Sequence, residues 1–268
     1  MKLTAIVPVK NEEQFIENCL RSVGFWDEVL VLDSGSSDKT ISIAKKMGAR
    51  VVEYEWQGFR YAHDYGATLA KGEWLLYVDA DERVSKKLAV QIQKVVDNPE
   101  HIAYQVNRRN FIFGKSMKHG GWYPDKVTRL MKKNGLVQWV GELHEYPHID
   151  GEIGHIDADL YHLTHRSMDW SLQKTRVYTK TMADIYHKAA HPKVRVKNFF
   201  GAMAREFWFR AVKEAGWKDG IRGWIEIIYQ TFNAFIIQVH LWEMQQKQSL
   251  DERYKDIDRQ IKKEISGK

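Results

Sequence analysis

Short apolar runs and segments with helical character alternate through the first 82 residues, and this alternation limits the possible folds more than any other feature of the chain. Four short apolar runs predict buried strands, at residues 3–9, 29–32, 51–54 and 74–78. Three helices are predicted between them, at residues 12–23, 40–47 and 59–70. Such alternation is typical of βαβ units in a parallel sheet, which binds ligands at the carboxyl ends of its strands.

The pattern changes after a further predicted helix at residues 85–97. Three more strands are predicted, at residues 103–113, 126–133 and 143–149. Helices then follow, at residues 169–190, 194–215 and 219–247, with a surface helix at 251–265. We therefore expect an α/β fold with a mixed, mostly parallel sheet and flanking helices in residues 1–167, and a helical region rich in basic and aromatic residues in 168–268.

Composition limits the class of protein further. Of the 268 residues, 44% are hydrophobic and 28% are charged, as in folded globular proteins. The single cysteine, Cys19, lies in an apolar-periodic stretch, so we expect a buried thiol and exclude a disulfide framework. The apolar run at residues 1–8 is too short for a signal peptide, and no run approaches the roughly 18 apolar residues of a membrane span. We therefore expect a cytoplasmic protein.

The net charge of +6 is unevenly distributed. Residues 1–100 hold slightly more acidic than basic side chains, whereas Lys and Arg predominate in residues 166–222, where Trp and Phe are interleaved with them. Amphipathic helices of this composition bind anionic membrane surfaces without crossing them. We therefore expect peripheral association with the inner face of the cytoplasmic membrane. The alternative is that these aromatic residues pack on the core or on one another.

Polar clusters follow three of the predicted strands. They read Pro8-Val9-Lys10-Asn11-Glu12, Asp33-Ser34-Gly35-Ser36-Ser37-Asp38 and Asp79-Ala80-Asp81-Glu82. In a parallel sheet the ends of these strands lie on one edge. Gly35 lets the backbone approach a ligand closely, and packing gives no reason for Asp33 and Asp79 at strand ends. The clusters therefore predict a binding site.

Asp79-Ala80-Asp81 has the spacing of a site for a divalent cation. Its two carboxylates can present oxygen ligands to Mg²⁺ or Mn²⁺, which would also take phosphate oxygens of a ligand and offset the charge on a departing diphosphate. The alternative is a solvated acidic turn before the helix at Ser85. Asp157-Ala158-Asp159 has the same spacing, but it lies in an alternating stretch, where we expect an edge strand and no metal.

In this order and spacing the three clusters resemble those of family 2 glycosyltransferases with the Rossmann-like GT-A fold. Later residues resemble the lipopolysaccharide-core β-glucosyltransferase branch, namely Trp122-Tyr123-Pro124-Asp125, Arg129-Leu130, Gly141-Glu142-Leu143-His144-Glu145, His162, His165 and Gly216-Trp217-Lys218-Asp219-Gly220. The resemblance covers nearly the whole chain. It implies an inverting, metal-dependent transfer of a sugar, expected to be a hexose, from a nucleotide diphosphate sugar, usually a UDP-sugar. The expected acceptor is lipid-linked or a lipopolysaccharide core.

The resemblance also implies roles for individual residues. Nucleotide-sugar binding is implied for Pro8, Val9, Asn11, Glu12, Asp33, Ser34, Gly35, Arg60, Asp79 and Ala80. Within this set, Asp33 is expected to contact the base, and Asp79 the ribose or the metal. Asp81 is the expected ligand of the Mn²⁺ or Mg²⁺ cofactor, and His165 would complete the metal shell. A structural role is the alternative for His162 and His165.

Inversion requires a general base that takes a proton from the acceptor hydroxyl. Glu145 is the expected base and Glu142 is its rival. We expect His144 to orient the base or to contact the donor, with a packed strand histidine as the alternative. Asp125 and Arg129 either bind a sugar hydroxyl or pair with each other.

Two other classes of function fit parts of the sequence. A sugar-nucleotide nucleotidyltransferase would be expected to carry a Gly-rich loop after the first strand, but residues 8–12 contain no glycine. A nucleic-acid-binding protein would explain the basic aromatic region, but carboxylates at strand ends would repel phosphate. We therefore expect no nucleic-acid partner.

Overall fold

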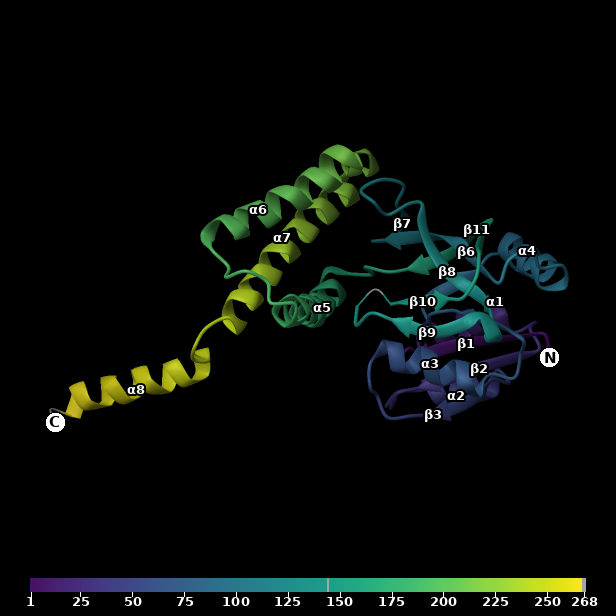
Figure 1. Ribbon diagram of the computed structural model, residues 1–268, viewed down its shortest axis with the longest axis horizontal. Helices are drawn as coiled ribbons and strands as arrows, with labels where there is room; N and C mark the ends of the chain where they lie inside the picture. Colours follow the sequence, from purple (N-terminus) through teal and green to yellow (C-terminus); the bar gives the residue numbers. More distant parts are fainter. Residues whose placement is uncertain (144, 267–268) are drawn as a thin grey trace. The chain divides into compact units, whose positions relative to one another are not determined.

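The chain divides into two compact units, Met1–Ser167 and Met168–Lys268 (Figure 1). The computed structural model describes residues 1–143 and 145–266, apart from the side chain of Phe59. Each unit is taken by itself below.

The first unit is built on one mixed sheet. Within the described residues its strand order is β3 (Arg50–Glu53), β2 (Glu28–Asp33), β1 (Leu3–Val9), β4 (Trp74–Tyr77), β8 (Asp125–Lys132), β6 (Ala103–Ile112), β11 (Ile153–Leu163) and β5 (Glu82–Val84), with the short β7 (Lys115–Ser116) paired to β6. The first four strands in this order are mutually parallel. Strand β8 is antiparallel to both of its neighbours, and β6 and β11 are parallel. The predicted α/β fold is confirmed.

Apolar side chains form a core on each face of this sheet. Helices α1 (Ile16–Val23), α2 (Thr40–Lys46) and α4 (Lys86–Asp97) pack into the first core, and α3 (Phe59–Leu69) contributes to the second. Successive residues of β1 alternate between the two, with Val7 in the first core and Ile6 in the second, as the period of a strand requires. Cys19 on α1 is fully buried, as predicted.

A separate two-stranded sheet is formed by the part of the chain between β8 and β11. It pairs β9 (Leu136–Val140) with β10 (Tyr146–Ile149) in antiparallel fashion. The sequence pattern predicts no strand at β9. It starts the next strand at residue 143, whereas β10 begins at Tyr146. The buried Trp139 of β9 joins the second core, where its ring stacks on His63 at 4.1 Å and meets Tyr77 edge-on at 4.8 Å. This packing anchors the segment between β9 and β10, which contains Glu145.

The second Asp-x-Asp sequence lies in β11, and the expectation of an edge strand is wrong. Strand β11 pairs with β6 along most of its length and with β5 at Leu160–His162, so β5 is the outermost strand in the described part of the sheet. The pairing with β6 shifts register between Ile156 and Asp159, at a bulge that includes Asp157.

The second unit is helical. It contains α5 (Met168–Lys188), α6 (Val196–Phe207), a π-helical turn (Trp208–Lys213), a 3₁₀ turn (Gly216–Asp219), α7 (Ile221–Met244) and α8 (Leu250–Ser266). Its apolar core is small and is formed by Ala183, Val194 and Leu241 with Phe199, Trp242 and Met244. Among the described residues, no helix is both long enough and apolar enough to traverse a lipid bilayer.

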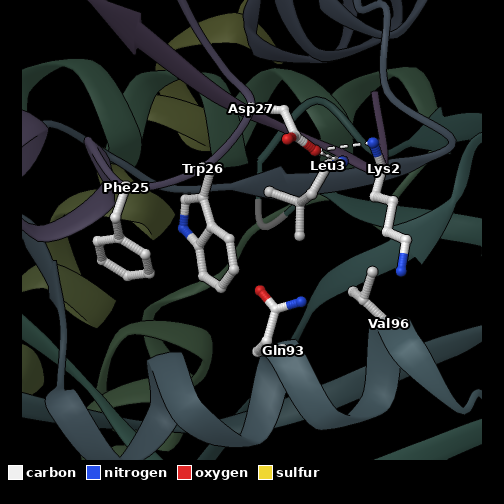
Figure 2. Close-up of a pocket in the computed structure, with 7 residues that line it drawn as sticks. All are labelled: Lys2, Leu3, Phe25, Trp26, Asp27, Gln93 and Val96. Atoms are coloured by element: carbon white, nitrogen blue, oxygen red, sulfur yellow. Dashed lines mark hydrogen bonds between the residues drawn. The ribbon is translucent and has the colours of Figure 1, made fainter.

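Figure 2 shows a surface hollow at the amino end of β1. Its lining residues are Lys2, Leu3, Phe25, Trp26, Asp27, Gln93 and Val96. Asp27 Oδ2 accepts hydrogen bonds from the backbone N–H groups of Lys2 (2.7 Å) and Leu3 (3.0 Å) and so ties this end of the strand. The hollow lies at the edge of the sheet opposite the polar clusters, because those follow the carboxyl ends of the strands.

Candidate functional site

The three polar clusters begin at one edge of the sheet, as the strand pattern predicts. Val9 at the end of β1 pairs with Asp33 at the end of β2, and the Ser34 N–H donates to the Val9 carbonyl (3.1 Å). On the other side of β1, the Val78 N–H donates to the Ile6 carbonyl (3.0 Å), just before Asp79. The parallel register therefore brings the loops after β1, β2 and β4 together.

Asn11 joins the loops after β1 and β2. Its backbone is left-handed (φ 55°), a conformation that Asn tolerates better than most residues. Its side-chain oxygen accepts from the Ser37 N–H (2.8 Å), and its own N–H donates to Ser36 Oγ (2.9 Å). The Glu12 N–H likewise donates to Thr40 Oγ1 (2.8 Å). These hydrogen bonds fix the two loops to each other.

Asp33 is fully buried, and only one of its two carboxylate oxygens accepts hydrogen bonds from the described residues. Its Oδ2 accepts from the N–H groups of Gly35 (2.9 Å) and Ser36 (2.8 Å), a turn that Gly35 permits with φ 91°. Its Oδ1 is buried and has no hydrogen-bond partner among the described residues, and the same holds for the hydroxyl of nearby Tyr54. Burial raises the pKa of Tyr54 to about 12. A buried acceptor without a donor is costly, so this edge is suited to a ligand N–H.

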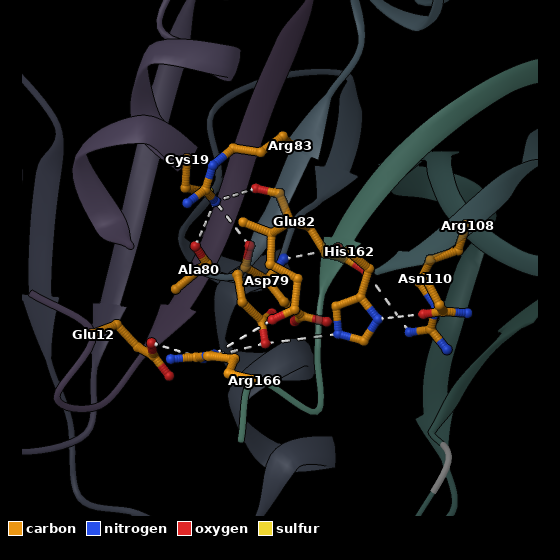
Figure 3. Close-up of polar contacts among 12 residues, drawn as sticks. Glu12, Cys19, Asp79, Ala80, Glu82, Arg83, Arg108, Asn110, His162 and Arg166 are labelled. Carbon is orange, nitrogen blue, oxygen red and sulfur yellow. Dashed lines mark hydrogen bonds and ion pairs between the residues drawn. The ribbon is translucent and has the colours of Figure 1, made fainter. Parts of the chain in front are cut away.

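Arg129 of β8 lies between two carboxylates of the loop after β4. Its guanidinium contacts Asp79 Oδ2 (2.5 Å) and Glu82 Oε1 (2.7 Å), and Arg108 lies 3.7 Å from the same Glu82 oxygen. Figure 3 shows Asp79, Glu82 and Arg108 within this polar cluster. Of the two alternatives for Asp125 and Arg129, their pairing with each other is wrong, because Asp125 accepts from Arg108 Nε (2.7 Å) instead.

Burial acts on every group of this cluster. It works to raise the pKa of Asp79, but the Arg129 guanidinium outweighs it and holds that pKa well below its usual range. It raises the pKa of Glu82. It also works to lower the pKa of Arg129, which Asp79 and Glu82 nevertheless keep above its ordinary value. Asp79 is therefore ionised and Arg129 is a fixed cation at the strand end.

Asp81 faces basic side chains from the end of β11. His162 Nε2 lies 3.7 Å and Arg166 Nη2 3.5 Å from Asp81 Oδ2. The side-chain N–H₂ of Asn110 donates to the Trp122 carbonyl and to Asp125, so its oxygen is the acceptor that faces His162 Nδ1 (2.6 Å). Burial works to raise the pKa of Asp81, but the interactions with His162 and Arg166 together outweigh it and lower that pKa. Asp81 is therefore also ionised.

Glu145 and Glu142 differ in environment. Glu142 is exposed, whereas Glu145 is half-buried and its Oε1 has no hydrogen-bond partner among the described residues. Burial raises the pKa of Glu145, and the charges of Asp79 and Arg129 also act on it. Glu145 therefore lies within electrostatic reach of the cluster at the strand ends. His144 lies outside the described residues.

Two predicted site residues have other contacts in the structure. Arg60 is largely exposed and pairs with Asp64 at 3.8 Å. Asp64, to which the sequence assigns no contact, accepts from the Trp139 N–H (2.8 Å) and so holds β9. The ring of His165 meets Trp122 edge-on at 5.2 Å. Pro8 and Val9 end strand β1, whereas Ser34 and Ala80 belong to the loops after β2 and β4, and Val9, Ser34 and Ala80 are buried.

Asp79 and Asp81 have the chemistry required of a divalent-cation site. Both are ionised carboxylates, and Mg²⁺-type sites often use only one or two carboxylates together with substrate phosphates. The residues that the structure describes contain no group of three His, Cys, Asp or Glu side chains arranged to hold a metal ion. These residues thus fit a cation that arrives with a phosphate ligand better than a cage built by protein alone.

The sequence prediction assigns no individual role to Glu82 or Arg166, and it gives Arg129 only a sugar hydroxyl or Asp125 as a partner. Arg129 carried a usable signal, since it stands between Val127 and Leu130 in a predicted strand, where a buried charge needs a partner. Arg166 carried none, because its contacts with Glu12 and Asp81 join segments far apart in the chain.

The chain is similar to known glycosyltransferases. A family model described as "Glycosyl transferase family 2" matches residues 4–190. An uncharacterized glycosyltransferase of Rickettsia bellii is 28% identical over 245 residues, which cover 88% of this chain and 76% of that protein. The lipopolysaccharide core biosynthesis glycosyltransferase LpsC of Rhizobium meliloti is 23% identical over 257 residues, covering 91% and 93%. The crystal structure of S. aureus TarS 1-349 in complex with UDP-GlcNAc has a TM-score of 0.49 at 17% identity, covering 88% of this chain and 82% of that chain.

Proposed function

The chain belongs to glycosyl transferase family 2, and from this premise we propose that it is an inverting hexosyltransferase that uses a UDP-sugar and a divalent cation. Its proposed acceptor is a lipid-linked glycan or a lipopolysaccharide core. The observation that carries the proposal is that ionised Asp79 and Asp81 lie together in the loop after β4, with the half-buried Glu145 within electrostatic reach of Asp79.

The environment of Asp33 favours a nucleotide whose base carries an N–H group. Its buried Oδ1 is an acceptor without a donor, and its Oδ2 already holds the loop that would surround the base. The uracil ring offers such an N–H, and its pairing with a carboxylate would be a charge-assisted hydrogen bond. We assign Asp33, Ser34 and Gly35 to the base and ribose, and Pro8, Val9, Asn11 and Glu12 to the wall of the same pocket.

Asp81, with Asp79, holds the cation in this proposal. A bound Mn²⁺ or Mg²⁺ would supply positive charge to the diphosphate as it departs. Arg129 keeps Asp79 ionised and fixed in place, while Asp81 remains the more adaptable ligand because its contacts with His162 and Arg166 are longer. His165 remains a proposed further ligand.

Glu145 is the proposed general base. It takes the proton from the acceptor hydroxyl while that oxygen attacks the anomeric carbon on the face opposite to the leaving diphosphate. Its raised pKa strengthens it as a base, since proton transfer is most efficient when the pKa lies nearer the working pH. The exposed Glu142 lacks this environment. We assign orientation of the base or contact with the donor to His144.

The acceptor class rests on the resemblance to the lipopolysaccharide-core branch and on LpsC, whose name places that protein in lipopolysaccharide core biosynthesis. The helical unit supports a membrane-bound acceptor, because it exposes Trp208 (55%) and Trp217 (50%). In the same segment Lys213 lies over the ring of Phe209 and Lys218 over the ring of Trp217. We propose peripheral binding to an anionic membrane surface, on the inner face of the cytoplasmic membrane.

The test is UDP release from a panel of UDP-hexoses with Mn²⁺ and a lipopolysaccharide-core acceptor. Asp81→Asn should lower the rate by about 100-fold or more, because a catalytic cation contributes several kcal/mol to the barrier. Asp157→Asn is the matched control, since Asp157 has the same Asp-x-Asp context but an 85% exposed side chain. Equal rates for Asp81→Asn and the wild type, or no UDP release from any donor, would contradict the proposal.

A further inference from the structure

Arg166 places a protein cation beside the proposed metal ligand. Its Nη2 lies 3.3 Å from Glu12 Oε2 and 3.5 Å from Asp81 Oδ2, and its guanidinium carbon lies 3.7 Å above the ring of Phe15. Figure 3 shows Arg166 extended from the end of β11 toward Glu12 of the loop after β1. One guanidinium thus joins carboxylates that follow two different strands.

The two arginines of the site are held differently. Arg129 makes short contacts of 2.5 and 2.7 Å, and only 8% of its side chain is exposed. The contacts of Arg166 with carboxylates are longer than the 2.7–2.9 Å of strong charge-assisted hydrogen bonds, and 23% of its side chain is exposed. Its backbone segment is anchored, because the Leu163 N–H donates to the Asp81 carbonyl (2.9 Å). The Arg166 Nε also donates to the Leu163 carbonyl (3.4 Å), so the fixed segment presents a partly exposed guanidinium beside Asp81.

We propose that Arg166 is a built-in counter-ion of the donor site, which lies between Glu12 and Asp81 in the free protein and turns to the donor diphosphate when donor and cation bind. This inference rests on the proposed function and deepens it, since it concerns how the same site is filled. It requires only that the diphosphate enter near Asp81, where Arg166 already is.

Electrostatics then couple the two ligands. A divalent cation at Asp81 would meet the positive charge of Arg166 beside the same carboxylate oxygen, so Arg166 opposes binding of the cation alone. A diphosphate offers Arg166 a new anionic partner and frees Asp81. Each ligand therefore raises the affinity for the other, and by the same factor. Without the donor, Arg166 neutralises the charge of Asp81, and the enzyme binds the cation weakly.

Binding measurements test this directly, without any turnover. Mn²⁺ binding is measured from the free-Mn²⁺ electron paramagnetic resonance signal with and without UDP, and UDP binding is measured calorimetrically with Mn²⁺ or with EDTA. In Arg166→Gln, Mn²⁺ alone should bind more tightly than to the wild type, and UDP in EDTA should bind more weakly. The coupling factor should fall by about fivefold or more, within the usual range of such couplings. If the role of Arg166 were purely structural, its replacement would weaken the binding of both Mn²⁺ and UDP.

Arg109→Gln is the matched control. Arg109 also pairs with a carboxylate, Asp159 (2.9 Å), and also lies over an aromatic ring, that of Tyr123 (5.4 Å). Its loss should leave both affinities unchanged. If thermal melting shows that Arg166→Gln does not fold, Arg166→Met replaces it, because an unbranched side chain can still cover Phe15. Arg166→Lys should restore weak binding of Mn²⁺ alone.

The outcomes separate this inference from the proposed function. Wild-type protein that binds neither UDP nor Mn²⁺ under any condition would overturn the proposed function. Coupled binding that is unchanged in Arg166→Gln would overturn the inference and leave the proposed function standing. Wild-type protein that fails to bind UDP in EDTA, yet binds it with Mn²⁺, would also overturn the inference, because Arg166 should then hold the diphosphate without metal.

Discussion

At the scale of residues, the site is a set of carboxylates whose pKa values are shifted in different directions by their surroundings. Arg129 keeps Asp79 ionised, whereas burial raises the pKa of Glu82 and of Glu145. Groups whose pKa values are pushed apart by their surroundings can serve different chemical roles at one pH. Asp79 is an ionised carboxylate suited to a cation, and Glu145 is a more basic carboxylate suited to accept a proton.

The difference between Glu145 and Glu142 yields a prediction at this scale. Glu145→Gln should lower kcat by about 100- to 10,000-fold, the usual contribution of a general base. In the wild type, kcat/KM should fall on acidification through the pKa of Glu145, which lies above that of an exposed glutamate, because only the carboxylate accepts a proton. The measurement is UDP release as a function of pH.

Two further variants check this assignment. Glu152→Gln changes a 92% exposed carboxylate and should leave both the rate and its pH profile unaltered. A large loss in Glu142→Gln with near-normal Glu145→Gln would transfer the role of base to Glu142.

At the scale of elements, the strands of the first unit position the polar side chains, and the helices of the second unit carry an exposed aromatic surface. The ends of β1, β2 and β4 fix the polar loops, and the hairpin of β9 and β10 carries Glu145. In the second unit, α6, the two turns after it and the start of α7 leave large aromatic side chains exposed to solvent. The exposed aromatic set comprises Phe200, Phe207, Trp208, Trp217 and Trp224.

This exposed aromatic set gives a prediction for these elements. Changing Trp208 and Trp217 together to Ser should weaken binding to anionic vesicles by more than about tenfold, since each buried large apolar side chain contributes about 1.5–3 kcal/mol. The measurement is vesicle co-sedimentation at low salt, with neutral vesicles for comparison. Phe25→Ser, at a 57% exposed position in the first unit, is the control and should have no effect. Equal binding of the double variant and the wild type would refute membrane docking through this set.

At the scale of the whole molecule, the first unit carries its own core and every residue assigned to the donor. Core side chains fill both faces of its sheet, whereas the second unit has a small core of its own. The family match, however, continues to residue 190, past the end of α5. We propose that residues 1–167 form the catalytic domain and that residues 168–268 serve the acceptor and the membrane.

A truncated chain tests this division. Residues 1–167 alone should unfold cooperatively and bind UDP in the presence of Mn²⁺, because the donor site and both cores lie within them, but they should not bind anionic vesicles. Circular dichroism melting, calorimetry and co-sedimentation measure these three properties. A fragment that lacks a cooperative transition would show that α5 belongs to the catalytic domain.

The sequence by itself determined the parallel half of the sheet and the meeting of three polar loops. Apolar runs of strand length between amphipathic helices have few ways to bury their faces, and parallel strands place their carboxyl ends on one edge. Short strands such as β5 and β9 escaped prediction, because a few residues give too little periodicity. The partners of the charged groups were decided by tertiary structure alone. Arg129 reaches Asp79 only because β8 lies beside β4, and Arg166 reaches Asp81 only because the end of β11 bonds to that loop. Pairing between distant segments depends on sheet order, which a local pattern of residues does not encode.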